Sequence, residues 1–313
     1  MSLSVLLVSF FTIVELNCEN LFDCVHDSLK DDTEFLPESY HHWTHYKYWQ
    51  KLTHIGQEII ACGENDGDWA LPDLIALCEV ENDSVMVDLT KKSLLRKAGY
   101  EYVMTNSPDA RGIDVALLYS PLSFGFINSH SIRIIPPKGM RPTRDILYVS
   151  GRVITGDTLH VFVVHAPSRF GGEKETLPYR MLVSEKLGEA IDSVTRISPN
   201  AKILIAGDFN DSYDSNPMKK LYDFKVSDVS VEAKGSHGAK GTYRYRGKWE
   251  SIDHILCSEN LKKGLSDCRI ADFPFLLEED DKYGGVHPKR NYYGAKYKNG
   301  FSDHLPLIAK FSF

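Results

Sequence analysis

Short apolar runs rich in β-branched residues recur along the whole chain, and they constrain the fold more than any other feature. Each run has about five to eight residues and is bounded by Gly, Pro, Asn or Asp, as is typical of buried strands. We therefore expect strands at residues 12–16, 74–78, 115–119, 147–154, 159–164, 203–206, 252–257 and 305–311. No internal repeat and no low-complexity linker separates them.

Three stretches between these runs have helical character. Residues 46–62 show apolar side chains at spacings of three and four, and residues 82–98 begin acidic and end basic before Gly99. A third helix is expected over residues 179–194, directly after Pro178. Many strands with a few substantial helices predict two packed sheets with helices outside, an α/β sandwich, formed by one domain over residues 12–313.

The composition disfavours one class of function, non-specific binding of nucleic acid, and leaves the cellular location open. A net charge of −7 argues against avid, sequence-independent binding of nucleic acid, although a local basic rim is compatible with it. Residues 1–11 are apolar but too short to span a bilayer, so they form a tail, an extra strand or a degenerate signal segment. We favour the cytoplasm slightly, with export as the alternative. The six cysteines lack metal-site spacing and are expected to be buried free thiols.

Polar side chains gather where the predicted strands begin or end. Carboxylates, amides and imidazoles in such positions suit metal-assisted attack of water on phosphorus. Mg²⁺ and Mn²⁺ prefer oxygen ligands, which Glu79, Asn17 and Asp303 could provide. The candidate residues, in chain order, are Asn17, Glu19, Glu79, His165, Asp208, Asn210, Asp253, Asp303 and His304.

This set resembles the endonuclease/exonuclease/phosphatase superfamily, which includes deoxyribonuclease I, apurinic-site endonucleases, neutral sphingomyelinases and inositol-polyphosphate 5-phosphatases. The most specific motifs are Gly207-Asp208-Phe209-Asn210, Ile252-Asp253 and Ser302-Asp303-His304. The resemblance covers nearly the whole chain. It implies a four-layered α/β sandwich like that of deoxyribonuclease I, and hydrolysis of a phosphate ester that depends on Mg²⁺ or Mn²⁺.

The resemblance also implies roles for the residues that match. Glu79 corresponds to the main metal ligand, assisted by Asn17 and by Glu19 or Asp303. Asp208 corresponds to the group that orients and deprotonates the attacking water, and Asn210 to the amide that holds that water.

The two histidines correspond to groups around the phosphate. His304, oriented by Asp253, would stabilise the pentacovalent phosphorane, and His165 would contact phosphate or help the leaving group. Neutralising an anionic ester calls for a metal and cationic imidazoles.

Basic residues outside these motifs are candidates for substrate contact. Arg169, Arg111 and Arg290 could each bind phosphate. The alternatives are an ordinary loop arginine for Arg169 and an ion pair with Asp114 for Arg111. Residues 282–299 combine Lys and Arg with Tyr, which suits substrate contact but also a loop that packs on the sandwich. The run Arg244, Arg246 and Lys248 has the same ambiguity.

The histidine-rich stretch 41–49 invites a metal site, but Trp43 and Tyr46 more simply attach a helix to the core.

The leading function is a divalent-metal-dependent phosphoesterase that hydrolyses phosphodiester bonds, or phosphomonoester bonds, by in-line attack of an activated water. Its substrate is either nucleic acid or a small phosphodiester. The alternatives are a repair-type endonuclease or exonuclease on abasic or nicked DNA, a lipid head-group phosphodiesterase, and a binding module that has lost catalysis. We expect a monomer without stable membrane insertion.

Overall fold

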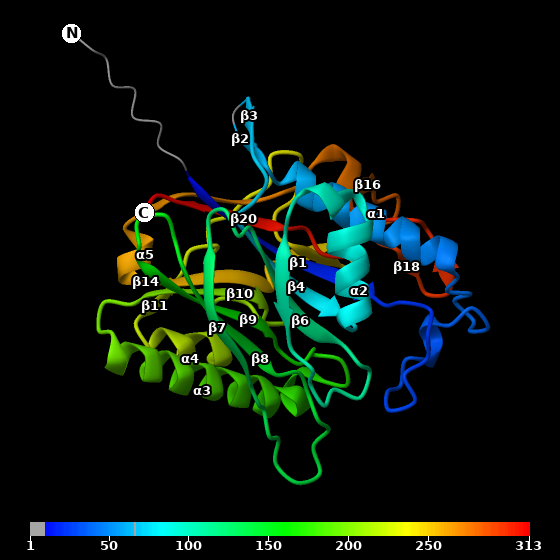
Figure 1. Ribbon diagram of the computed structural model, residues 1–313. Helices are drawn as coiled ribbons and strands as arrows, with labels where there is room; N and C mark the ends of the chain where they lie inside the picture. Colours follow the sequence, from blue (N-terminus) through cyan, green and yellow to red (C-terminus); the bar gives the residue numbers. More distant parts are fainter. Residues whose placement is uncertain (1–9, 66) are drawn as a thin grey trace.

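Two mixed six-stranded sheets pack face to face in the computed structural model, which describes residues 10–65 and 67–313 (Figure 1). In each sheet one central pair is parallel, β1 with β4 and β9 with β10, and the other pairs are antiparallel. The first sheet has the order β15 (Leu265–Ile270), β20 (Leu307–Phe311), β1 (Phe11–Leu21), β4 (Leu74–Val80), β6 (Asp114–Tyr119) and β5 (Glu101–Met104). The second has β11 (Val226–Asp228), β14 (Asp253–Ser258), β10 (Lys202–Asp208), β9 (Thr158–His165), β8 (Ile146–Arg152) and β7 (Gly125–Ile132).

Helices cover the outer face of each sheet. Against the first sheet lie α1 (His45–Ala61) and α2 (Asp83–Val87), and against the second lie α3 (Glu173–Ile197) and α4 (Asn216–Tyr222) (Figure 1). The remaining elements are short: α5 (Glu259–Lys262), the 3-10 turns Thr33–Phe35 and Pro274–Leu276, and the strand pairs β2 (Glu64–Asn65) with β3 (Asp68–Trp69), β12 (Tyr243–Tyr245) with β13 (Lys248–Glu250), β16 (Leu277–Glu279) with β17 (Val286–Pro288), and β18 (Tyr292–Tyr293) with β19 (Lys296–Tyr297).

Strand alternation explains why there are four layers. On β4, Ala76 packs between the sheets, whereas its neighbour Ile75 packs under α1. On β10, Leu204 faces the interior between the sheets and Ile205 faces α3. Strands that are apolar on both faces must be covered on both faces. The predicted four-layered sandwich is confirmed.

The helix predicted over residues 82–98 is wrong as a single element. The chain forms α2, a π-helical turn over Asp88–Lys92 and a 3-10 turn over Leu94–Lys97. The break lies at Ser93, whose backbone is extended and whose hydroxyl accepts a hydrogen bond from Leu95 N. Serine competes in this way with the helical hydrogen bonds.

The third helix starts earlier than predicted, at Glu173, so Pro178 lies inside α3. Arg180 stabilises this first part, because its guanidinium donates to Thr176 Oγ1 at 2.7 Å and to the Glu173 carbonyl at 3.3 Å. These bonds hold the turns that precede Pro178, a residue that donates no backbone hydrogen bond to the helix.

Other expectations have mixed outcomes. Trp43 is fully buried and donates to the Phe22 carbonyl at 3.0 Å, whereas Tyr46 is 69% exposed and takes no part in the attachment. The six cysteines are free thiols, as expected, but Cys24 and Cys268 are only half-buried. Residues 1–9 lie outside the described part of the chain. Within the described part, no helix is long and apolar enough to cross a membrane.

Gly207 is required by the close approach of β9 and β10. A Cβ atom there would lie 1.8 Å from the Val164 carbonyl oxygen. We predict that Gly207→Ala lowers the free energy of unfolding by about 3 kcal/mol, as measured by urea denaturation. Gly125→Ala is the control, because its Cβ would meet only ordinary contacts, at 3.7 Å and beyond. Equal stability of the two variants would contradict this.

Candidate active site

Irregular backbone at the strand ends shapes the site. The pairing of β1 with β4 shifts register between Asn17 and Leu21. Four residues nearby have positive φ although none is glycine: Glu19 (48°), Asn20 (59°), Glu79 (61°) and Asn210 (53°). Such conformations are costly and gather where a chain must aim particular side chains. Here they turn polar groups from two sheets toward one place.

Hydrogen bonds and close polar contacts link residues at the ends of four strands. Asn20 N donates to Glu79 Oε2 at 2.9 Å, and Asn17 Nδ2 donates to Asp208 Oδ2 at 3.0 Å. His165 Nε2 lies 3.6 Å from Asp208 Oδ2 and 3.8 Å from Glu79 Oε1. The ends of β1, β4, β9 and β10 therefore meet in one site.

His304 and Asp253 form a buried ion pair. His304 Nδ1 lies 2.8 Å from Asp253 Oδ2. Burial alone would lower the pKa of His304, but the charge and hydrogen bond of Asp253, with the charges of Asp208 and Asp303, raise it well above its usual value. His304 is therefore a cation with its second nitrogen, Nε2, directed away from Asp253.

Asp208 lies beside this ion pair and forms a cluster of three with it. Its carboxylate, that of Asp253 and a ring nitrogen of His304 offer ligand atoms that all lie within 4.8 Å of one another. Burial, and then repulsion from Asp253, raise the pKa of Asp208 to about 7. The backbone N–H of Asn210 holds the carboxylate at 2.8 Å, while the Asn210 side chain donates to the Ala166 carbonyl at 3.1 Å.

The expectation that both imidazoles are cationic is wrong for His165. Burial lowers the pKa of His165 well below its usual value, and the charges of Arg144 and Arg111 lower it further. A neutral ring can donate or accept a proton but adds no positive charge.

Arg290 joins two of the predicted metal ligands. Its guanidinium lies 2.8 Å from Asp303 Oδ2 and 3.5 Å from Glu19 Oε1. Burial would raise the pKa of Asp303, but Arg290 and His304 hold it below its usual value. Burial and the charge of Asp303 raise the pKa of Glu19 to about 7.

The donor set fits a hard divalent cation. Asn17, Glu19, Glu79 and Asp303 present carboxylate and amide oxygens without any thiolate, as Mg²⁺ and Mn²⁺ prefer. The crowding of Glu19 against Asp303, which raises the Glu19 pKa, is what a bound cation would relieve.

The other predicted arginines have protein partners. Arg111 donates to Asn20 Oδ1 and so lies at the site. It does not pair with Asp114, whose Oδ1 accepts from the hydroxyl of Thr105 and from Ser107 N instead. Arg169 pairs with Glu250 of β13, so its candidate role as a phosphate clamp stays a prediction.

The segment 282–299 combines packing with a place at the site. Its Arg290 reaches the site carboxylates, whereas Tyr292 donates to the His41 carbonyl at 3.1 Å. In the run before β14, Arg244 is structural, because it pairs with Asp280 at 3.3 Å and donates to the Gly284 carbonyl at 2.7 Å.

Sequence reasoning missed three residues at the site. Glu15 is fully buried, both its oxygens lack a hydrogen-bond partner among the described residues, and burial and Asp253 raise its pKa well above normal. It lies two residues before Asn17 on the same face of β1, a spacing that could have identified it. The other two are Tyr243 and Arg144. The ring centroid of Tyr243 lies 4.9 Å from that of His304, and Arg144 donates to the Ala166 carbonyl at 3.0 Å.

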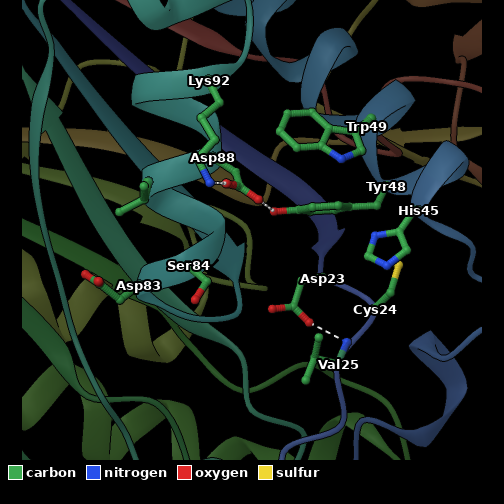
Figure 2. Close-up of a pocket in the computed structure, with 11 residues that line it drawn as sticks. Asp23, Cys24, Val25, His45, Tyr48, Trp49, Asp83, Ser84, Asp88 and Lys92 are labelled. Atoms are coloured by element: carbon green, nitrogen blue, oxygen red, sulfur yellow. Dashed lines mark hydrogen bonds and ion pairs between the residues drawn. The ribbon is translucent and has the colours of Figure 1, made fainter.

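A cavity of about 400 Å³ lies away from these residues, between α1, α2 and the segment after β1 (Figure 2). Its Asp88 accepts from the Tyr48 hydroxyl at 2.9 Å and pairs with Lys92 at 2.8 Å, and its Asp23 accepts from Val25 N. These carboxylates already have partners. His45 faces this cavity, whereas His41 packs against Tyr292, so the histidine-rich stretch is dispersed.

The sequence profile of the Endonuclease/Exonuclease/phosphatase family matches residues 12–312. The chain belongs to this family. It is accordingly a hydrolase of phosphate esters, and the non-catalytic alternative has no support in a chain that keeps Asp208, Asn210 and His304. No curated protein matches the chain significantly.

Solved structures share the fold over nearly the whole chain. A mannosyl-6-phosphatase of Bacteroides thetaiotaomicron is 15% identical with a TM-score of 0.65, covering 97% of this chain and 100% of its own. The human Nocturnin catalytic domain with bound sulfate is 17% identical with a TM-score of 0.58, at 97% and 94% coverage. TDP2 of Caenorhabditis elegans is 15% identical with a TM-score of 0.61, at 97% and 75% coverage. At these identities the likeness concerns the fold.

Asp208 has a raised pKa in the folded protein, so it stabilises the fold at low pH and that contribution is lost as pH rises from about 4 to about 7. We predict that Asp208→Asn, measured without metal, is more stable than wild type at pH 8 by on the order of 2 kcal/mol. At pH 4 the difference should disappear. Urea denaturation at pH 4 and at pH 8 measures this difference in stability. A variant that is less stable than wild type at pH 8 would contradict the repulsion between Asp208 and Asp253.

Proposed function

We propose that this hydrolase cleaves phosphate esters with the help of Mg²⁺ or Mn²⁺, by in-line attack of a water molecule. The observation that carries the proposal is the buried cluster of Asp208, Asp253 and His304 beside the carboxylate of Glu79. It combines a base, a fixed cation and an oxygen ligand within one site.

Glu79, Asn17, Glu19 and Asp303 would hold the metal. When bound, a divalent cation supplies positive charge to phosphoryl oxygens and to the leaving oxygen. Arg290 occupies the space between Glu19 and Asp303 and would compete with the cation or move aside for it.

Asp208 is the proposed base. A pKa of about 7 suits proton abstraction near neutral pH, and the Asn210 N–H fixes its orientation. Asn17 donates to the other oxygen of Asp208, so the carboxylate is held on both sides. A water on this carboxylate would attack phosphorus on the side opposite the leaving group.

His304 is the proposed oxyanion stabiliser. Asp253 binds Nδ1, so the proton on Nε2 is available to a phosphoryl oxygen. The raised pKa keeps that proton in place above neutral pH. His165, being neutral and near both Glu79 and Asp208, is suited to orient water or the leaving oxygen.

We favour a small phosphate ester over duplex DNA as substrate. A cavity of about 330 Å³ adjoins the site and is bounded by Glu19 and Arg290. The rings of Tyr40, His41 and Tyr292 line it, with centroid distances of 4.0 Å and 4.4 Å along the series. A cavity of this size suits the alcohol group of a small ester. The net charge of −7 also disfavours a polyanion.

The test is hydrolysis of bis-p-nitrophenyl phosphate, p-nitrophenyl phosphate, mannose 6-phosphate and abasic-site duplex DNA, each with Mg²⁺, Mn²⁺ or EDTA. We expect metal-dependent cleavage of a small ester and little cleavage of DNA. Preferred nicking of the abasic duplex would support the repair nuclease instead. Turnover that persists in EDTA would contradict the proposed dependence on a divalent metal.

We predict that Asp208→Ala and His304→Ala each lower kcat by about 10²–10⁴, because each removes one proton-transferring or charge-stabilising group. Circular dichroism should show that both variants fold. Gly125→Ala, far from the chemistry, serves as the control. Turnover near that of wild type in either variant would refute the mechanism.

A further inference from the structure

A buried lysine lies behind the site, on the helix that covers the first sheet. Lys51 of α1 is 1% exposed, and its ammonium donates to the Phe301 carbonyl. Burying an ammonium group is costly, and a helix that only needed packing would be served by an apolar residue of similar size. The position of Lys51 therefore calls for a functional reason.

Lys51 contacts the loop that carries two of the site residues, Asp303 and His304. Phe301 is followed by Ser302, Asp303 and His304. Ser302 Oγ donates to the Asn17 carbonyl at 2.6 Å and accepts from His304 N at 3.1 Å. The loop is thus joined to β1 on one side and to α1 on the other.

The lysine charge faces the same loop. It favours the ionised forms of the Glu19 and Asp303 carboxyls. Glu58 is also buried on α1, and its oxygens have no hydrogen-bond partner among the described residues. Burial raises the pKa of Glu58 to about 8, although the charge of Lys51 opposes this, so the carboxyl is largely protonated near neutral pH.

We propose that Lys51 is a positioning residue for the hydrolysis, which holds residues 301–304 from behind so that Asp303 and His304 reach phosphate in a fixed geometry. It touches neither substrate nor the reacting atoms. This inference rests on the proposed function, since it assigns Lys51 a part in that reaction.

Lys51→Met tests it, because the variant keeps the length of the side chain and removes the donor and the charge. We expect kcat to fall by on the order of 10²-fold, the effect of a displacement of about 1 Å in a catalytic group, with little change in KM. The melting temperature should fall modestly, because the Phe301 carbonyl loses its buried donor. A purely structural lysine would give the same loss of stability with unchanged kcat.

Two further variants separate the possible causes. Lys51→Gln keeps a donor without the charge, so an intermediate kcat would assign part of the effect to the hydrogen bond. Glu58→Gln removes the neighbouring buried carboxyl group without touching the loop and should leave kcat unchanged. If Glu58→Gln lowers kcat as much as Lys51→Met, the positioning role is refuted.

Amide hydrogen exchange gives a readout that does not need turnover. In Lys51→Met, the peptide that contains residues 301–305 should exchange faster than in wild type, whereas peptides from β10 should not change. Unchanged exchange and unchanged kcat would overturn the proposal. If wild type cleaves no phosphate ester, the proposed function fails, and unchanged exchange in that peptide would then reject the positioning role separately.

Discussion

The structure depends on one electrostatic problem, the burial of several carboxylates in a space between two sheets. Glu15, Asp208 and Asp253 all lie within the sandwich, where water cannot screen them. The His304 cation compensates for part of this charge. Burial, and then repulsion from Asp253, raise the pKa values of Glu15 and Asp208, so that these two groups hold protons more readily than free carboxyls do.

The sandwich explains how the carboxylates are brought so close. Each sheet has a central parallel pair, and the carboxyl ends of β1 and β4 face those of β9 and β10. Residues nearly two hundred positions apart, Asn17 and Asp208, therefore bond directly. Strands fix Asn17, Glu79 and Asp208, which suits a site whose chemistry depends on precise position. Asp303 and His304 lie on the loop that precedes β20.

Sequence patterns predicted the sheets, the layers and most of the candidate site, because strand periodicity and strand-end polarity are local signals. The helix of residues 82–98 was mispredicted because Ser93 competes with the helix for a backbone hydrogen bond. The sequence did not indicate Lys51, which lies on a helix and becomes important only through a contact with Phe301, 250 positions away. It also could not foresee the neutral His165, because burial sets that charge.

The most direct test of the account is a titration of the metal-free protein with Mn²⁺, followed by electron paramagnetic resonance of the free ion. We predict that wild type binds Mn²⁺ and that Glu79→Gln, which removes the charge of the proposed main ligand, binds it far more weakly. The folded state of the variant would be confirmed by circular dichroism. Equal Mn²⁺ affinity in the two proteins would contradict the placement of the metal at the end of β4.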